Sequence, residues 1–181
     1  MKKTYAGLLA VSFALVTTVV LADRDEERGG SFSASSASVS MNSTYQKECS
    51  GCHMAYPADL LPAASWDKVM NNLADHFGDN AEVDKASEKE IRDYLAKNAG
   101  DVTRTRLASK VLRGLGNEVP MRISELPYIA REHRKELPKD VFKKSDKLTS
   151  LAQCDGCHTK AKEGSFRERE IVIPGVGRWE D

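Results

Sequence analysis

The four cysteines of this 181-residue sequence form two close pairs, and a histidine directly follows each pair. The first motif is Cys49, Cys52 and His53, and the second is Cys154, Cys157 and His158. The spacing C-x-x-C-H is the attachment signature of c-type haem. The two sulfurs form thioethers with the vinyl groups of one porphyrin, and the histidine lies beneath the ring, where it binds iron. The two motifs therefore predict two covalently bound haem c groups.

Other uses of paired cysteines fit this spacing less well. Zinc ribbons usually separate their pairs by about 15–20 residues, whereas Cys52 and Cys154 are 102 positions apart. A thioredoxin-like redox pair needs a βαβ context, which we do not find around either motif. Two disulfides would suit an exported protein. Neither zinc nor disulfides explain why a histidine directly follows each pair.

Haem iron has two axial positions, so two further ligands are needed, and the sequence has two further histidines. His76 ends an amphipathic segment that the apolar spacing predicts as a helix over 66–77, capped by Ser65 and stopped by Gly78. His133 lies on the apolar face of a second predicted helix that starts near Pro127. A lone histidine on an apolar face is usually a hydrogen-bonded core residue, but two irons in need of ligands change that expectation. We predict bis-histidine ligation at both haems.

Methionine is the main alternative as a distal ligand, and it would raise the reduction potential. Met121 is the best candidate, because Met70 fits the core of its own helix and Met54 follows His53 too closely to reach the opposite face of the haem. The simplest pairing is local, with His76 on the first haem and His133 on the second. Exchange of the two distal ligands also fits the sequence.

The N-terminal segment has the pattern of a secretory signal peptide over residues 1–22, with a basic start, an apolar run and small residues before Asp23. An uncleaved membrane anchor is the alternative. Residues 23–43 are rich in serine and glycine and read as a flexible tether. Since c-type haem is attached on the far side of the membrane, an exported, periplasmic protein is expected.

The composition balances 27 basic against 27 acidic side chains, which gives no reason to expect nucleic-acid binding. Cleavage of the leader removes Lys2 and Lys3 and leaves 25 basic against 27 acidic side chains, a formal charge of −2. With 40% hydrophobic and 7% aromatic residues, the side chains predict a modest core. Two porphyrins would add apolar bulk to that core.

The folded part is predicted to be mainly α-helical, with a first haem domain over 44–103 and a second over 104–181. In the first, a capping box at Ser43 predicts a short helix that ends at the first motif, and a second box at Ser87 opens a helix that ends before Gly100. Together with the helix over 66–77, this order resembles the class I cytochrome c plan.

The second predicted domain carries the His133 helix, a helix capped by Ser145 that leads to the second motif, and an extended tail. In this tail, residues 171–173 are expected to form either a short strand or an extended segment over the haem edges. Between the domains, four basic residues follow one another without an acidic one: Arg104, Arg106, Lys110 and Arg113. The segment is either a solvated helix face or a cationic patch for an acidic redox partner or for haem propionates.

Beyond the haem motifs, the sequence resembles the dihaem cytochromes c that partner a small oxygen-binding monohaem cytochrome c. The matching stretches are ECSGCHMAYPADLLPAASW (48–66), LADHFGDNA (73–81), YLAKNA (94–99), PMRISELPYIAREHR (120–134), CDGCH (154–158) and FREREIVIP (166–174). The resemblance implies an N-terminal cytochrome c-like domain, a distinct C-terminal haem domain and bis-histidine ligation by His53, His76, His133 and His158. It also implies a partner cytochrome c and, in some cases, a membrane cytochrome b.

Two irons with both axial positions filled leave no place for a substrate. The sequence therefore predicts a monomeric electron-transfer protein without catalytic side chains rather than an enzyme. The alternatives are a peroxidase-like or gas-binding haem protein with one labile distal ligand, and a subunit of a larger respiratory complex.

Overall fold

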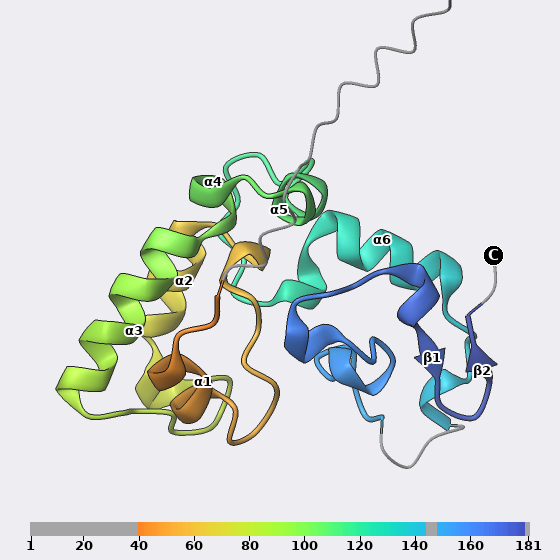
Figure 1. Cartoon of the computed structure of the whole chain (residues 1–181), viewed down its shortest axis with the longest axis horizontal. Helices are drawn as coiled ribbons and strands as arrows, with labels where there is room; N and C mark the ends of the chain where they lie inside the picture. The colour runs from red at the N-terminus through yellow and green to blue at the C-terminus, as the bar shows by residue number, and fades with distance from the viewer. Residues whose placement is uncertain (1–39, 144–147, 180–181) are drawn as a thin grey trace, which may run out of the picture. The chain divides into compact units, whose positions relative to one another are not determined.

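The computed structural model describes residues 40–143 and 148–179, which are mainly helical (Figure 1). The α-helices are α1 (Ser43–Cys49), α2 (Ala63–Met70), α3 (Lys85–Asn98), α4 (Gly100–Thr103), α5 (Arg106–Val111) and α6 (Pro127–Glu136). The short 3-10 helices of this part are Ala58–Leu60, Leu73–Asp75, Ile123–Glu125, Val141–Lys143, Cys154–Gly156, Ala161–Glu163 and Glu168–Glu170. The predicted leader and nearly all of the predicted tether lie outside the described residues.

The tail forms one small antiparallel sheet of β1 (Val172–Ile173) and β2 (Gly177–Arg178). Val172 pairs with Arg178, and Ile173 pairs with Gly177. The strand predicted over 171–173 is therefore present, although it is one residue shorter. Ser145, predicted to cap a helix, lies outside the described residues, and residues 148–153 form a bend and a turn rather than that helix.

Helix α3 was the clearest prediction, and it is present with Ile91 and Leu95 fully buried on its apolar face. Its cap differs from the prediction. The Asp84 carboxylate, and not Ser87, caps the helix by accepting hydrogen bonds from the amides of residues 86 and 87. Likewise Asn42, rather than Ser43, caps α1 through the amide of Tyr45. The caps thus lie one to three residues before the predicted positions.

The helix predicted over 66–77 was wrong at both ends. Helix α2 begins at Ala63 after Pro62, so Ser65 is a buried residue of the first turns and not a cap. The helix ends at Met70, because Asn71 and Asn72 turn the chain toward the next 3-10 helix. Asparagine competes with helical hydrogen bonding and favours helix ends. As a result His76 lies beyond the helix, in a turn.

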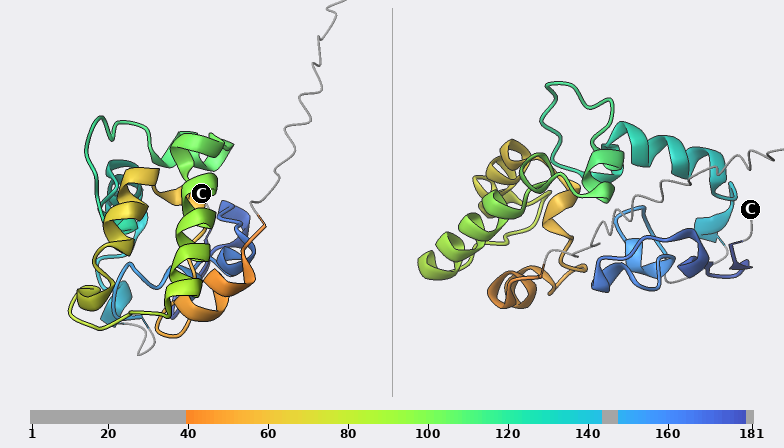
Figure 2. Two further views of the ribbon diagram at one scale, coloured as in Figure 1. Left: turned by 90° about the vertical axis from the view of Figure 1, so that its left-hand side faces the viewer. Right: turned by 45° about the horizontal axis from the view of Figure 1, so that its top comes forward.

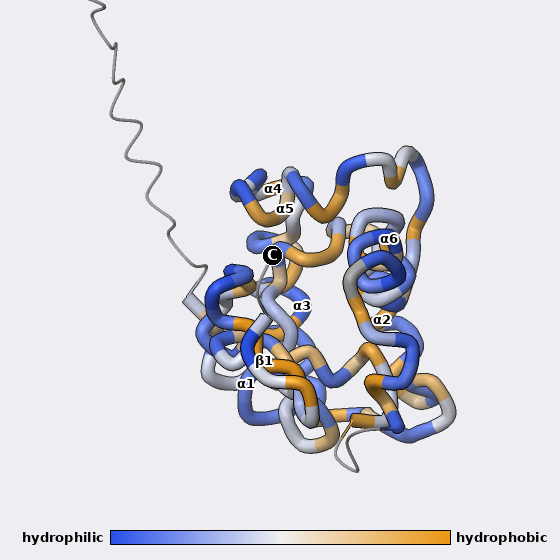
Figure 3. Tube along the Cα trace, turned by 90° about the vertical axis from the view of Figure 1, so that its right-hand side faces the viewer, coloured by the Kyte–Doolittle hydropathy of each residue, from blue (hydrophilic) through white to orange (hydrophobic). Residues whose placement is uncertain are grey.

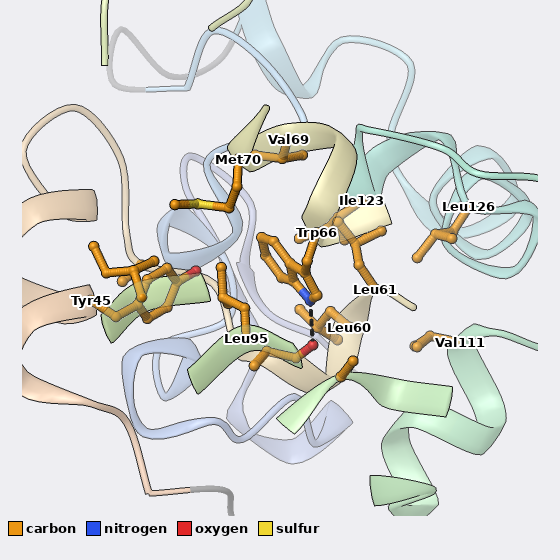
Figure 4. Close-up of a cluster of buried hydrophobic side chains, with 14 of the residues drawn as sticks. Tyr45, Leu60, Leu61, Trp66, Val69, Met70, Leu95, Val111, Ile123 and Leu126 are labelled. Atoms are coloured by element: carbon orange, nitrogen blue, oxygen red, sulfur yellow. Dashed lines mark hydrogen bonds between the residues drawn. The ribbon is translucent and has the colours of Figure 1, made fainter. Parts of the chain in front are cut away.

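Most buried side chains form one large cluster between α1, α2, α3, α5 and the segment before α6 (Figure 4). At its centre the Trp66 indole N–H donates to the backbone oxygen of Ala58 at 2.6 Å, and the ring stands edge-on to Tyr45. Helices α2 and α3 lie side by side (Figure 2), where the Arg92 guanidinium donates to the Met70 carbonyl at 2.8 Å. The cluster includes Val111 and Leu126, so it continues past the boundary predicted between 103 and 104. That boundary stays a prediction.

A second, smaller cluster lies in the C-terminal part and contains Val141, Leu148 and Ile173. Hydrophilic residues predominate along α6 (Figure 3). Among the described hydrophobic side chains of this helix, Tyr128 and Ile129 pack against the large cluster. Because the second cluster contains only three buried side chains among the described residues, a porphyrin would add to the apolar core of this part.

Candidate haem-binding sites

The first motif begins where α1 ends. Cys49 is the last residue of the helix and is half-buried, whereas Cys52 is exposed three residues later. Burial raises the pKa of the Cys49 thiol to about 11, with a smaller contribution from the Glu48 carboxylate. The thiol is therefore protonated at neutral pH. None of the four cysteines forms a disulfide, so all four sulfurs are free to bond to a porphyrin.

His53 is held in place by its own neighbours. Its Nδ1 lies 2.7 Å from the Met54 backbone oxygen, and its ring stacks on Tyr56 with centroids 4.7 Å apart at an interplanar angle of 22°. A carbonyl oxygen can only accept a hydrogen bond, so Nδ1 carries the proton and Nε2 keeps its lone pair. This is the tautomer that an Nε2-bound metal requires.

A tight turn brings His76 to the same place. The His76 amide donates to the Asp79 oxygen at 2.7 Å, and the two residues between them, Phe77 and Gly78, have φ of 60° and 106°. A bulky residue in the left-handed region is uncommon and is strained. The strained turn places the His76 ring 6.2 Å from the His53 ring, centroid to centroid, at an interplanar angle of 32°.

The second motif begins in a 3-10 helix that runs from Cys154 to Gly156, and Cys157 and His158 follow that helix. The His158 amide donates to the Cys154 oxygen at 2.8 Å. The C-terminal tail also contacts the motif, because the Val172 amide donates to the Cys157 oxygen at 2.9 Å. Burial raises the pKa of the Cys154 thiol to about 11, helped by the nearby Asp155 carboxylate.

The second pair of histidines has nearly the same separation as the first. The His133 and His158 rings lie 6.1 Å apart, centroid to centroid, at an interplanar angle of 64°. The Nδ1 of His133 lies 2.8 Å from the Ile129 carbonyl, one helical turn earlier in α6. Because the carbonyl oxygen can only accept a hydrogen bond, Nδ1 of His133 carries the proton, and Nε2 on the other side of the ring keeps its lone pair.

The separations of about 6 Å test whether an iron fits between the rings. A metal–imidazole nitrogen bond is about 2 Å long, and the bonded nitrogen lies roughly 1 Å from the centre of its ring. Two such ligands on opposite sides of one iron therefore place their ring centroids roughly 6 Å apart. Both observed separations, 6.2 and 6.1 Å, fit an iron between the rings.

The electrostatics of the histidines agree with this fit. Burial, with the facing His133 as a second cause, lowers the pKa of His158 to about 4. Burial, followed by the nearby His53 and Arg122, lowers the pKa of His76. Both imidazoles are thus neutral at pH 7, as metal coordination requires. The Nδ1 atoms of these two residues are buried and have no hydrogen-bond partner among the described residues.

The two motifs also share a cleft of about 410 Å³. Its walls include residues 51–53 of the first motif, Asp155 of the second motif, and Gln153 directly before it. In the described part of the chain, no three histidine, cysteine or acidic side chains gather as a metal site. Met121, the alternative distal ligand, packs against the large hydrophobic cluster.

Sequence reasoning missed the aromatic residues around the histidines. Tyr56 stacks on His53, Phe77 stands edge-on to His76 at 4.8 Å, and Phe166 stands edge-on to His158 at 5.3 Å. The Arg122 guanidinium lies over the Phe77 ring, 3.9 Å from its centroid. Tyr56 and Phe77 follow the predicted ligands His53 and His76 closely in the sequence, and this proximity could have indicated that they contact the imidazoles. Phe166 follows His158 by eight residues and gave none.

Comparisons with known proteins agree with these observations. The sequence profile of the family described as dihaem cytochrome c matches residues 45–166. A dihaem cytochrome c from Rhodobacter sphaeroides is 44% identical and covers 72% of this chain and 100% of its own, with a TM-score of 0.63. A dihaem cytochrome c from Shewanella baltica OS155 is 37% identical and covers 77% of this chain and 98% of its own, also with a TM-score of 0.63.

A search of curated proteins found no match. The profile match extends over most of the described residues, and both solved structures match over nearly their full length. Membership implies two covalently bound haem c groups, in agreement with the two C-x-x-C-H motifs. The chain belongs to the dihaem cytochrome c family.

Proposed function

We propose that this dihaem cytochrome relays single electrons between redox partners through two low-spin haems, each with two histidine ligands. The first haem is held by Cys49 and Cys52 and bound by His53 and His76; the second is held by Cys154 and Cys157 and bound by His158 and His133. The observation that supports the proposal is the ring separation of about 6 Å in both pairs, which one iron would fill and which would leave no space for a substrate between the rings.

The chain's own residues prepare each site for this role. Backbone carbonyls fix the tautomer of His53 and His133, and this raises the basicity of the nitrogen that faces the iron. Burial keeps His76 and His158 neutral. When bound, haem iron supplies the change between ferric and ferrous states, and the ligands and burial set its potential.

We further propose that the protein acts in the periplasm, on the basis of the predicted leader over 1–22. No helix among the described residues is long and apolar enough to cross a membrane. The proposed partners are a small monohaem cytochrome c and a membrane cytochrome b. The four basic side chains at 104, 106, 110 and 113 are all exposed, which suits the docking of an acidic partner surface.

A redox titration monitored by visible absorption tests the relay. Two low-spin haems predict two one-electron steps whose spectra together account for all the haem. His76→Met and His133→Met should each raise the potential of one haem and leave the other nearly unchanged, since methionine favours the ferrous state. If neither substitution altered either haem, the assignment of distal ligands would be wrong.

The partner proposal needs a separate measurement. The rate of reduction by a membrane fraction, or of electron exchange with a monohaem cytochrome c, should fall as salt rises, because docking between charged surfaces is screened. Replacing Arg104 and Arg106 with glutamine should lower that rate and weaken its dependence on salt. A rate that is indifferent to both changes would exclude this surface as the docking site.

A further inference from the structure

Tyr56 lies three residues after His53, and its ring covers one face of the imidazole. The rings are nearly parallel, with centroids 4.7 Å apart and planes at 22°. The imidazole is bound on one edge by the Met54 carbonyl, so its remaining freedom is rotation of the ring plane about the direction to the iron. A stacked ring at this distance opposes that rotation, because turning the imidazole would drive its edge into the phenol.

The other end of Tyr56 reaches the second motif. Its hydroxyl donates to the backbone oxygen of Ala152 at 2.6 Å, across 96 positions of sequence. Ala152 lies two residues before Cys154, and the turn around it is held by the Gln153 side chain, whose oxygen accepts from the amides of Thr149 and Ser150. The hydroxyl therefore ties a ligand of the first haem to the loop that presents the second haem's first cysteine.

Tyr56 is half-buried, so its hydrogen bond to Ala152 is partly shielded from competing water. Phe166 plays a similar local part at the second motif, where it stands edge-on to His158 and also packs against the large hydrophobic cluster.

We propose that Tyr56 is a positioning residue that couples the two haem sites. Its ring sets the plane of the His53 imidazole, and its hydroxyl fixes the loop before Cys154 relative to the first haem. This inference rests on the proposed role of His53 as an iron ligand. It assigns the coupling of the two haem sites to one side chain. A displacement of the loop before Cys154 would move Tyr56 and so rotate the His53 imidazole about its bond to the iron.

Two substitutions in the haem-loaded protein separate the ring from the hydroxyl. Tyr56→Phe removes only the hydrogen bond, and Tyr56→Leu removes the stacked ring as well. Tyr128→Phe is the matched control, because the Tyr128 ring lies under Lys110 and its hydroxyl makes no hydrogen bond with a described residue. The readouts are the electron paramagnetic resonance of the ferric haems and amide hydrogen exchange around the second motif.

Tyr56→Phe should leave both ferric signals in place and speed exchange of the amides of Gly156, Cys157 and His158 about fivefold to tenfold, the effect of one lost hydrogen bond. Tyr56→Leu should in addition shift the g-values of the first haem alone. The control should change neither readout. Variants that kept wild-type exchange would overturn the proposal, and so would a Tyr56→Leu protein with unshifted g-values.

The two proposals fail differently. If the wild-type protein lacked two low-spin signals, bis-histidine ligation itself would be refuted. If the wild-type signals were present and the Tyr56 variants matched the control, only the coupling through Tyr56 would be refuted. Should Tyr56→Leu not take up haem, exchange in Tyr56→Phe still decides whether the hydroxyl couples the loop before Cys154 to the first site.

Discussion

The two pairs of histidines differ in the angle between their rings, and this difference predicts two distinct ferric haems. The planes of His53 and His76 are 32° apart, whereas those of His133 and His158 are 64° apart. Each imidazole raises the energy of the iron d orbital that overlaps its π system. Two iron d orbitals can overlap the imidazole π systems. Parallel imidazoles raise the same orbital, so the energy difference between the two orbitals is large. Perpendicular imidazoles raise one orbital each, so their effects on this energy difference cancel.

The size of the difference follows from these angles. When both imidazole planes contain the iron–nitrogen axis, the contributions of the two ligands to the d-orbital splitting add as two vectors separated by twice the interplanar angle. The net splitting therefore varies with the cosine of the interplanar angle. The cosines are about 0.85 for the first pair and about 0.44 for the second. The first haem should therefore show a rhombic splitting about twice that of the second.

Electron paramagnetic resonance of the fully ferric protein at low temperature measures this splitting. We expect one rhombic low-spin signal and one that is closer to axial, in equal amounts. His76→Met should remove the rhombic bis-imidazole signal, and His133→Met should remove the other. Met121→Leu is the control and should change neither. Two signals of equal splitting, or variants that remove the opposite signals, would refute the reasoning from ring geometry.

Three further predictions concern the part of the fold that holds the first haem. Trp66→Phe leaves the Ala58 oxygen without its donor and should lower the free energy of unfolding by about 2–4 kcal/mol in a urea titration. Gly100→Ala would press a methyl group against the Asp59 backbone oxygen and should cost about 1–3 kcal/mol in the same assay; an unchanged midpoint would contradict the packing. Hydrogen bonds from a serine and two amides hold the pKa of Asp84 below its usual range, so its stabilisation is present above the unfolded pKa and is lost as the pH falls through the folded pKa. The free energy of unfolding of Asp84→Ala should therefore be lower than that of the wild type at about pH 7, and the two values should become equal at about pH 2.

The sequence was most informative where local chemistry decides the structure. The C-x-x-C-H spacing is set by the porphyrin itself, and it identified both haem motifs without any knowledge of the fold. Helix α3 followed from a long apolar stripe, which buries Ile91 and Leu95 as expected. Helix α6 begins at Pro127, as expected for a residue that lacks an amide hydrogen.

Other features depend on contacts that are distant in sequence or on an unusual backbone. His76 was expected on a helix, but the helix ends at Met70 and a strained turn with Phe77 at positive φ carries the ligand instead. Gly78 does not end the helix as predicted but lies in this turn with positive φ, and no local pattern indicates a phenylalanine in the left-handed region beside it. The contact between Tyr56 and Ala152 spans 96 positions, so only the tertiary structure could show it.

The central claim is that both irons are saturated by pairs of histidines. Absorption spectra of the oxidised and reduced protein, recorded with and without carbon monoxide and referred to the haem content per chain, test it most directly. We predict two haems per chain, low-spin bands in both oxidation states and a reduced spectrum that carbon monoxide does not change. A high-spin fraction, or a shift of the reduced spectrum with carbon monoxide, would contradict the account and indicate an open or labile axial position.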